Sequence, residues 1–206
     1  MHLNNNLEQQ VSAIYKSWFE DLNLTGGVRP DSWYNTEFSK IANIVSGKRP
    51  SVRASKCNDE TPIPIIGAAS IMGFTDKANF TDRILVIGRV GTHGVVQRLS
   101  IPCWASDNTL IITCPYYEYA NQILQRVDYN LMNRGSTQPL ITQGDMKKIS
   151  VLAPDHETLL KFEDSVGPLM TKLESNIKEN NYLAHLRDAL LQKMMSGEID
   201  LSENDL

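Results

Sequence analysis

Apolar residues near the start of the chain recur at three- and four-residue steps. Over residues 7–19 this spacing places them on one face of a helix, so an N-terminal helix is predicted there. The glycines and the proline of residues 24–30 should end it. Beyond them lie short β-rich runs separated by Gly, Pro, Asn and Asp clusters, which predict an irregular sheet. These runs cover residues 38–45, 62–67, 84–88 and 109–113.

A second helix is predicted after the last of these runs. Over residues 117–133 apolar side chains repeat every four residues, which is typical of a helix with one buried face. Gly135 should end this helix, because glycine adopts the left-handed backbone that often follows a last helical turn. We expect the helix to cover the sheet.

The pattern changes after Pro154. Asp155 can cap a helix start, and Gly167 with Pro168 should divide the helical region in two, because proline lacks a backbone donor but fits a first turn. Residues 168–195 would then form a helix about 40 Å long at about 1.5 Å per residue, ended by Gly197. This exceeds what one small core needs, so part of its apolar stripe should pack on another helix. The stripe comprises Leu169, Leu173, Ile177, Leu183, Leu186, Leu190 and Met194.

Three asparagines, Asn176, Asn180 and Asn181, interrupt this stripe. Polar residues at a helix seam can fix the register of two helices at a cost in stability. A solvated middle of the helix explains them equally well. Both explanations stay open.

These elements together predict an α+β fold. An N-terminal helix occupies residues 1–24, an irregular β-rich domain with its covering helix occupies residues 30–153, and a long helical arm able to form a coiled coil occupies residues 154–206.

Charge is distributed unevenly along the chain. Residues 1–32 hold two Lys/Arg against four Asp/Glu, residues 33–150 hold thirteen against nine, and residues 151–206 hold five against eleven. The net charge of -4 therefore hides a basic middle between acidic ends. A basic middle suggests contact with a polyanion, while the acidic ends suit other partners.

Composition places the chain among globular proteins. Its 41% hydrophobic and 21% charged residues are ordinary for a protein that folds. No apolar run is long enough to cross a bilayer, and the first residues lack the layout of a signal peptide. We therefore expect a cytoplasmic protein without a membrane partner.

The three cysteines are odd in number and lack metal-binding spacing. We interpret Cys57, Cys103 and Cys114 as reduced packing residues and expect no metal site.

A glycine cluster at residues 88–94 follows an apolar strand but does not resemble a nucleotide loop. It lacks the G-x-G-x-x-G spacing and the Gly-Lys-Ser/Thr ending, and Val95 and Val96 continue it as a strand and not as a helix. We predict a tight turn between two strands that displays Arg89, Thr92 and His93. Contact with DNA or with solvent alone is equally compatible with this spacing.

The residue patterns of common enzymes are missing from the sequence. Residues 114–117 (CPYY) come nearest to the loop with which methyltransferases grip a flipped adenine, but they lack its polar first residue. The four histidines are scattered, and no H-E-x-x-H, G-x-S-x-G or acidic nuclease cluster occurs. We therefore expect no catalysis by this chain.

Hydrogen-bond donors are instead spread over three loops of the basic middle. Arg and Lys can neutralise phosphates or pair with guanine, Gln can bond adenine, and Ser or Thr can do either. Each residue alone could be ordinary solvated surface, but together they favour DNA binding. The predicted DNA-binding residues are Lys48, Arg49, Arg89, Thr92, His93, Arg134, Ser136, Thr137, Gln138, Lys147 and Lys148.

Six stretches carry a resemblance to a known family. They are residues 46–50 (SGKRP), 63–73 (IPIIGAASIMG), 87–95 (IGRVGTHGV), 104–110 (WASDNTL), 135–144 (GSTQPLITQG) and 190–199 (LLQKMMSGEI). In this order they resemble Type I restriction-modification DNA specificity subunits. Full-length members carry two target-recognition domains alternating with two long helices, whereas this chain has one of each and resembles half of such a subunit.

The resemblance implies a role in a larger complex. Two copies could associate head to tail through the helical stripe, each copy reading one half of a split DNA site. The implied partners are double-stranded DNA, methyltransferase (modification) subunits that bring S-adenosylmethionine and methylate adenine, and a restriction subunit. The chain itself would be non-catalytic and hold no cofactor.

Two other functions remain open. The chain could be a decoy that binds the methyltransferase subunit without directing methylation. It could also be a stand-alone enzyme on an unfamiliar β-rich fold, which the missing residue patterns make the weakest of the three hypotheses.

Overall fold

The computed structural model describes residues 2–90, 94–132, 140–196 and 198. The chain divides into two compact units. The helical unit combines Met1–Ile14 with Asp164–Leu206, and the sheet unit is Tyr15–Glu163. The predicted mixture of helices and strands is confirmed. The predicted division into residues 1–24, 30–153 and 154–206 stays a prediction.

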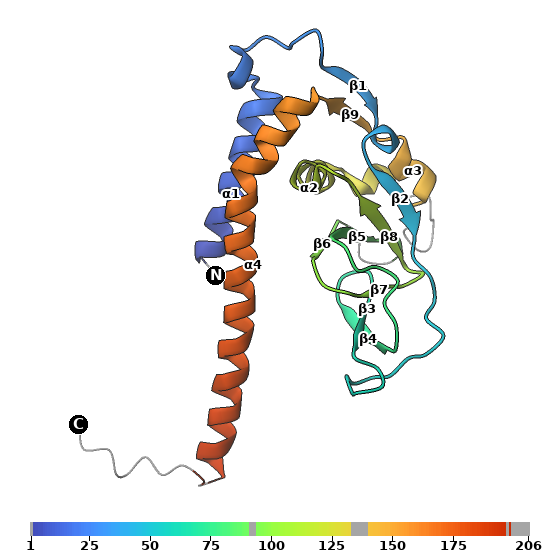
Figure 1. Cartoon of the computed structure of the whole chain (residues 1–206), viewed down its shortest axis with the longest axis vertical. Coiled ribbons are helices and arrows are strands. Elements are labelled where there is room, and N and C mark those ends of the chain that lie inside the picture. The colour runs from blue at the N-terminus through green and yellow to red at the C-terminus, as the bar shows by residue number, and fades with distance from the viewer. Residues whose placement is uncertain (1, 91–93, 133–139, 197, 199–206) are drawn as a thin grey trace, which may run out of the picture. The chain divides into compact units, whose positions relative to one another are not determined.

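A four-stranded antiparallel sheet forms the centre of the sheet unit (Figure 1). Its strand order is β2-β8-β5-β6, and the inner strand β5 is buried at every position. The bounds are β2 (Asn43–Ser46), β5 (Ile84–Gly88), β6 (Val96–Leu99) and β8 (Thr109–Thr113). β5 and β8 coincide with two predicted runs. The run at residues 38–45 is a strand only at its end, because a 3-10 turn, η3 (Phe38–Lys40), precedes β2.

Two smaller sheets complete the unit. One has the order β4-β3-β7, in which β3 pairs antiparallel with β4 and parallel with β7, and the other pairs β1 with β9. The predicted run at residues 62–67 is confirmed as β3. The bounds are β1 (Tyr34–Glu37), β3 (Ile63–Ile66), β4 (Ile71–Thr75), β7 (Trp104–Ala105) and β9 (Ser150–Ala153).

α2 (Tyr117–Arg126) packs against β5 and β6, as the predicted covering helix should. The prediction that it reaches residue 133 is wrong. Val127 adopts an extended backbone with ψ of 128°, and the Tyr129 hydroxyl donates to the Leu124 carbonyl at 2.8 Å. The chain therefore leaves the helix and continues as a 3-10 turn, η4 (Tyr129–Met132). Gly135, the predicted helix end, lies outside the described residues.

A buried carboxylate ties α2 to the sheet. Glu118 is 1% exposed and pairs with the guanidinium groups of Arg83, at 2.9 Å, and Arg98. Both guanidinium groups also lie over the Tyr117 ring, 4.1 and 5.1 Å from its centre. A buried charge must be paired to be tolerated. Two cations of the basic middle therefore serve the fold.

α4 (His156–Met195) is one continuous helix of 40 residues. The prediction that Gly167 and Pro168 divide it is wrong. Proline removes one backbone hydrogen bond, but Val166 and Met170, on either side of it, are both buried on the same helix face. Burial of that face stabilises a helix that continues across the proline. The predicted Asp155 cap is confirmed, because its carboxylate accepts from the Thr158 N–H at 2.9 Å.

Within the helical unit, α1 (His2–Tyr15) and α4 lie side by side and antiparallel (Figure 1). Asn176 is 8% exposed and its side-chain amide donates to that of Asn4 at 3.0 Å. This interhelical bond matches the register explanation for Asn176, whereas Asn180 and Asn181 are exposed to solvent. No helix in the described ranges is both long and apolar enough to span a membrane.

The three cysteines differ in burial. Cys103 is fully buried and Cys114 half-buried, as packing residues should be, but Cys57 is exposed, so the packing prediction is wrong for it. Burial raises the pKa of both the Cys103 and the Cys114 thiol to about 11. Neither thiol is an activated nucleophile.

An aromatic cluster joins the first and last segments of the sheet unit. Phe19 lies 4.9 Å from Tyr119 and 5.1 Å from Phe162, ring centre to ring centre, in edge-to-face geometry. Tyr15 and Trp33 extend the cluster, and the indole of Trp33 donates to Asp155 at 2.8 Å. The turn after α1, helix α2 and the first turns of α4 therefore share one core.

Glu163 adds a polar link at the same place. Its carboxylate accepts hydrogen bonds from the backbone N–H groups of Glu118, at 3.1 Å, and Tyr119, at 2.8 Å. The N-cap residue of α2, Tyr116, supplies no side-chain cap. Glu163 thus caps α2 from another helix.

Glu163→Ala should lower the free energy of unfolding by about 1 kcal/mol, the usual cost of a lost helix cap. Urea denaturation measures it. The matched control is Glu157→Ala. Glu157 is an exposed carboxylate of the same helix that pairs with Lys161 at 2.6 Å, and its loss should lower the free energy of unfolding by less than about 0.5 kcal/mol. Equal losses in both variants would contradict the capping role.

The stability should also depend on the pH through Glu163. Burial raises its pKa above the ordinary 4.5, although the two backbone N–H groups oppose this. A raised folded-state pKa gives stability that is present below the unfolded pKa and is lost as the pH rises through the folded one. Glu163→Gln removes this titration. Its unfolding free energy, measured in urea from about pH 4 to about pH 7, should therefore decline less than that of the unmodified chain.

Candidate nucleic-acid interface

The loop that follows β2 is held against the turn between β7 and β8. The Gly47 N–H donates to the Thr109 carbonyl at 3.0 Å, the Lys48 N–H donates to the Ala105 carbonyl at 3.1 Å, and the Trp104 indole donates to the Lys48 carbonyl at 2.6 Å. A Cβ atom on Gly47 would lie 1.9 Å from the Ser106 carbonyl oxygen. Only glycine permits this approach, which fixes the backbone on which Lys48 and Arg49 are displayed.

The second predicted loop lies at the same end of the central sheet. β5 and β6, the strands on either side of the predicted turn, pair antiparallel, and residues 91–93 of that turn lie outside the described residues. The Arg89 N–H donates to the Asn108 carbonyl at 3.0 Å, and the Arg89 carbonyl accepts from Ile141 at 2.9 Å. Val90 forms a β-bridge with Leu140, next to the third predicted loop. The structure therefore brings Gly47, Arg89 and Leu140, which belong to or follow the three loops, to one end of the sheet.

Six of the predicted contact residues lie outside the described residues. They are Thr92, His93, Arg134, Ser136, Thr137 and Gln138. Of the predicted loop residues that the structure describes, Lys48 and Arg49 are exposed, while Arg89 is partly buried.

A hollow of about 250 Å³ lies between the loop after β2 and the β7–β8 turn. Arg49, Pro50 and Arg53 form one side, and Ser106, Asp107 and Asn108 form another. Ile65 and Met72 contribute apolar wall. The sequence prediction missed Arg53, Asp107 and Asn108. Arg53 lies just past the loop of residues 46–50, but nothing in the sequence indicated that the β7–β8 turn folds against that loop.

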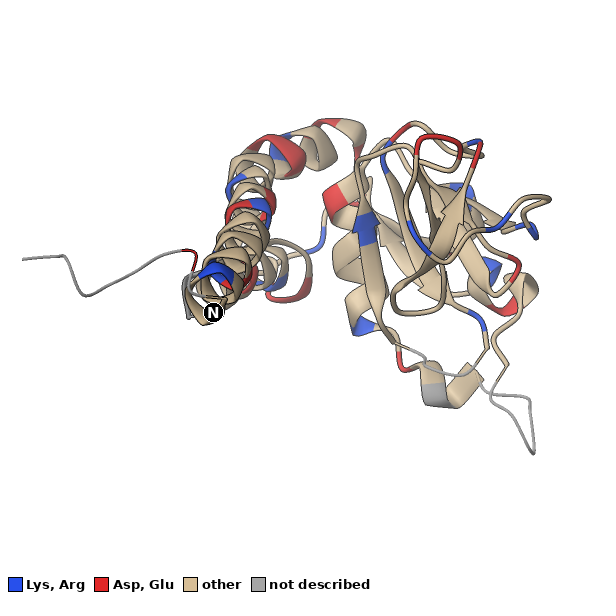
Figure 2. Ribbon diagram, turned by 90° about the horizontal axis from the view of Figure 1, so that it is seen from below, with Lys and Arg blue, Asp and Glu red and all other residues tan. Residues whose placement is uncertain are grey.

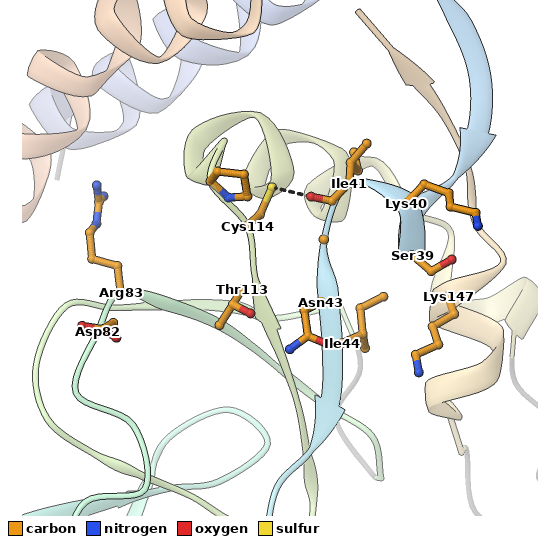
Figure 3. Close-up of a pocket in the computed structure, with 12 residues that line it drawn as sticks. Ser39, Lys40, Ile41, Asn43, Ile44, Asp82, Arg83, Thr113, Cys114 and Lys147 are labelled. Carbon is orange, nitrogen blue, oxygen red and sulfur yellow. Dashed lines mark hydrogen bonds between the residues drawn. The ribbon is translucent and has the colours of Figure 1, made fainter. Parts of the chain in front are cut away.

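Lys147 and Lys148 do not join this group. Lys147 ends the short helix α3 (Gln143–Lys147) and lines a separate open cleft of about 940 Å³ with Lys40 and Arg83 (Figure 3). Asn43 and Ile44, which begin β2, line the same cleft, whereas the loops lie where β2 ends. Lys148 follows α3 and is exposed. The chain thus holds two basic regions at opposite ends of β2.

The one cysteine that lines the cleft is not an activated nucleophile. The Cys114 thiol donates to the Ile41 carbonyl at 3.1 Å (Figure 3). Among the residues that the structure describes, no three His, Cys, Asp or Glu side chains gather as a metal site. Figure 2 shows basic residues spread over the strands and loops of the sheet unit, with acidic residues among them. Charge alone therefore does not mark one face.

The apolar stripe of α4 that was predicted to bind a second copy and partner subunits is buried in one part and exposed in the other. Leu173 is buried and Leu169 partly buried. The rest of the stripe is exposed, along with Tyr182, Leu191 and Met195. The exposed stripe residues are Ile177, Leu183, Leu186, Leu190 and Met194.

Known proteins with similar sequences are specificity subunits. The chain is 24% identical over 198 residues to the Type I restriction enzyme HindI specificity subunit of Haemophilus influenzae, covering 82% of this chain and 42% of that protein. It is 29% identical over 99 residues to the MjaIX specificity subunit of Methanocaldococcus jannaschii, covering 47% and 22%. The chain spans less than half the length of these relatives. No protein-family model matches it.

Solved structures give the same class of fold. The S subunit of a Type I restriction-modification system from M. genitalium aligns with a TM-score of 0.68 at 20% identity, covering 93% of this chain and 53% of that chain. The HsdS subunit from Thermoanaerobacter tengcongensis aligns with a TM-score of 0.55 at 13% identity, covering 95% and 52%.

The fold is that of a Type I specificity subunit, over about half the length of one. The chain resembles Type I restriction-modification specificity subunits in its sequence as well, so the predicted resemblance is confirmed.

Gly47→Ala should destabilise the sheet unit by about 1–3 kcal/mol, because the added methyl group overlaps the Ser106 carbonyl and the loop must shift. Urea denaturation measures the loss. Gly144→Ala is the control, since a Cβ there would meet only the Thr142 hydroxyl at 3.6 Å, an ordinary contact. An unchanged midpoint for Gly47→Ala would refute the close approach.

Proposed function

We propose that this chain is a DNA sequence-recognition subunit of a Type I restriction-modification system. The observation that carries the proposal is the similarity to specificity subunits, in sequence over 82% of the chain and in fold over 93%. In such a complex the chain selects the site, and partner subunits perform the chemistry.

The loops at the end of the central sheet support this function. Their backbones are fixed by hydrogen bonds to neighbouring strands, while Lys48 and Arg49 stay exposed. DNA readers need this combination, because cations bind phosphates and a rigid backbone aims side chains at base edges. The loop end of the sheet unit is therefore the proposed DNA-facing surface.

Catalysis in this proposal belongs to the partners. Methyltransferase subunits bring S-adenosylmethionine and methylate adenine, and a restriction subunit cleaves. This chain contributes neither cofactor nor reacting group.

The proposed assembly is a head-to-tail homodimer through α4. Exposed apolar side chains at three- and four-residue steps, among them Leu183, Leu186 and Leu190, form a stripe suited to another helix. Each copy supplies one sheet unit, so a dimer presents two, related by a twofold axis. Such a dimer would read a split, symmetric site.

The test is to co-express the chain with the methyltransferase subunit of its system and to map adenine methylation at base resolution. Methylation at a split symmetric motif is the expected result. A stable complex without new methylation would overturn the proposal and favour a decoy that occupies the methyltransferase.

Leu186→Asp should convert the dimer to a monomer, because a carboxylate in an apolar helix interface costs several kcal/mol. Sedimentation velocity measures the change. Asp188→Ala, an exposed substitution on the same helix, should leave the dimer intact. A monomeric unmodified chain at micromolar concentration would count against the homodimer.

A further inference from the structure

Arg49 and Asp107 form an ion pair at the rim of the hollow among the loops. The Arg49 Nε lies 3.4 Å from the Asp107 Oδ2, and the two side chains are 85% and 43% exposed. A pair this exposed contributes little to folding stability. The ion pair therefore matters for the orientation of the Arg49 side chain more than for the stability of the fold.

The contact leaves the end of the guanidinium group unengaged. Its shortest distance runs to Nε, and the Arg49 side chain forms no hydrogen bond within the described part of the chain. Both terminal amino groups are thus available on one planar fork. That fork matches two acceptors side by side, such as the O6 and N7 atoms of guanine in the major groove.

Neighbouring cations differ in this respect. The Arg53 guanidinium donates to the Met72 carbonyl at 2.7 Å, so one of its donors already serves the β4 backbone. Lys48 carries an exposed ammonium on a flexible stem and lacks the rigid planar fork of arginine. Of the three, Arg49 is the one best suited to bidentate recognition.

The position of Asp107 favours a base edge over a phosphate as the group that Arg49 binds. A carboxylate 3.4 Å from the arginine would repel a phosphate bound there. Base edges carry no net charge, and the amino group of a cytosine next to guanine is itself a donor. The apolar wall from Pro50, Ile65 and Met72 suits a base pair better than a charged backbone group.

We infer that Arg49 reads one guanine of the target by donating to O6 and N7, and that Asp107 is a positioning residue that holds Arg49 in the reading orientation. This inference rests on the proposed DNA-recognition function and adds to it one base pair of the target and the residue that selects it.

The test is selection of bound sequences from a randomised duplex DNA library by the full chain, together with its methyltransferase subunit. The unmodified chain should enrich a motif that contains a G·C pair. In Arg49→Ala the guanine preference at one position should fall by about tenfold, while the rest of the motif stays.

Asp107 is tested by two variants. Asp107→Ala should weaken the preference at the same position as Arg49→Ala and at no other. Asp107→Asn should restore part of it, because the amide oxygen can still accept from Nε. A merely structural role for Asp107 would not move the preference at one base.

Lys48→Ala is the matched control from the adjacent residue. Removing a phosphate contact should weaken binding to all sequences alike and reduce the slope of log K against log salt by about 1, with the motif unchanged. Uniform weakening by Arg49→Ala, with an unchanged motif, would overturn the inference and leave the proposed function standing. Failure of the unmodified chain to enrich any motif would overturn both.

Discussion

The sheet unit depends on the aromatic cluster around Phe19, Tyr119 and Phe162. These rings come from the turn after α1, from α2 and from the first turns of α4. Large aromatic side chains bury much apolar area, and the edge-to-face geometry adds directional preference. Glu163 strengthens the same joint by capping α2 through two backbone N–H groups. Segments far apart in the sequence thereby close the unit at one end, and the proposed reading loops occupy the other end of the central sheet.

At the loop end the constraint is backbone geometry. Gly47 allows the loop after β2 to approach the Ser106 carbonyl closely, and the Trp104 indole holds the next carbonyl. Loops fixed in this way lose little further entropy when their side chains meet a ligand. An exposed side chain on such a loop can be replaced without disturbing the loop backbone. The loop backbone and the displayed side chains are thus separate features, since Lys48 and Arg49 contribute little to the core.

The charges of the chain are divided between the fold and the surface. Arg83 and Arg98 neutralise the buried Glu118 and are committed to holding α2 on the sheet. Counted along the sequence, the middle region holds thirteen basic residues. In the structure Arg98 and Arg89 are partly buried, so neither is fully available at a charged surface. Lys147 lines the cleft beside the start of β2, whereas Lys48 and Arg49 follow the end of that strand, so Lys147 is separate from the loop residues with which the sequence prediction grouped it.

Local patterns alone determined the elements with strong periodicity: the N-terminal helix, β5, β8, the start of α2 and the Asp155 cap of α4. The sequence also carried the resemblance to specificity subunits, through six stretches in a fixed order. Tertiary structure decided what depends on burial. Val166 and Met170 keep α4 continuous through Pro168, and Tyr129 folds back to end α2 at Arg126. The ion pair between Arg49 and Asp107 also needed the fold, because these residues are distant in sequence and meet only when the β7–β8 turn packs on the loop after β2. Periodicity reports which face of an element is apolar, but it does not report which distant segment will cover that face.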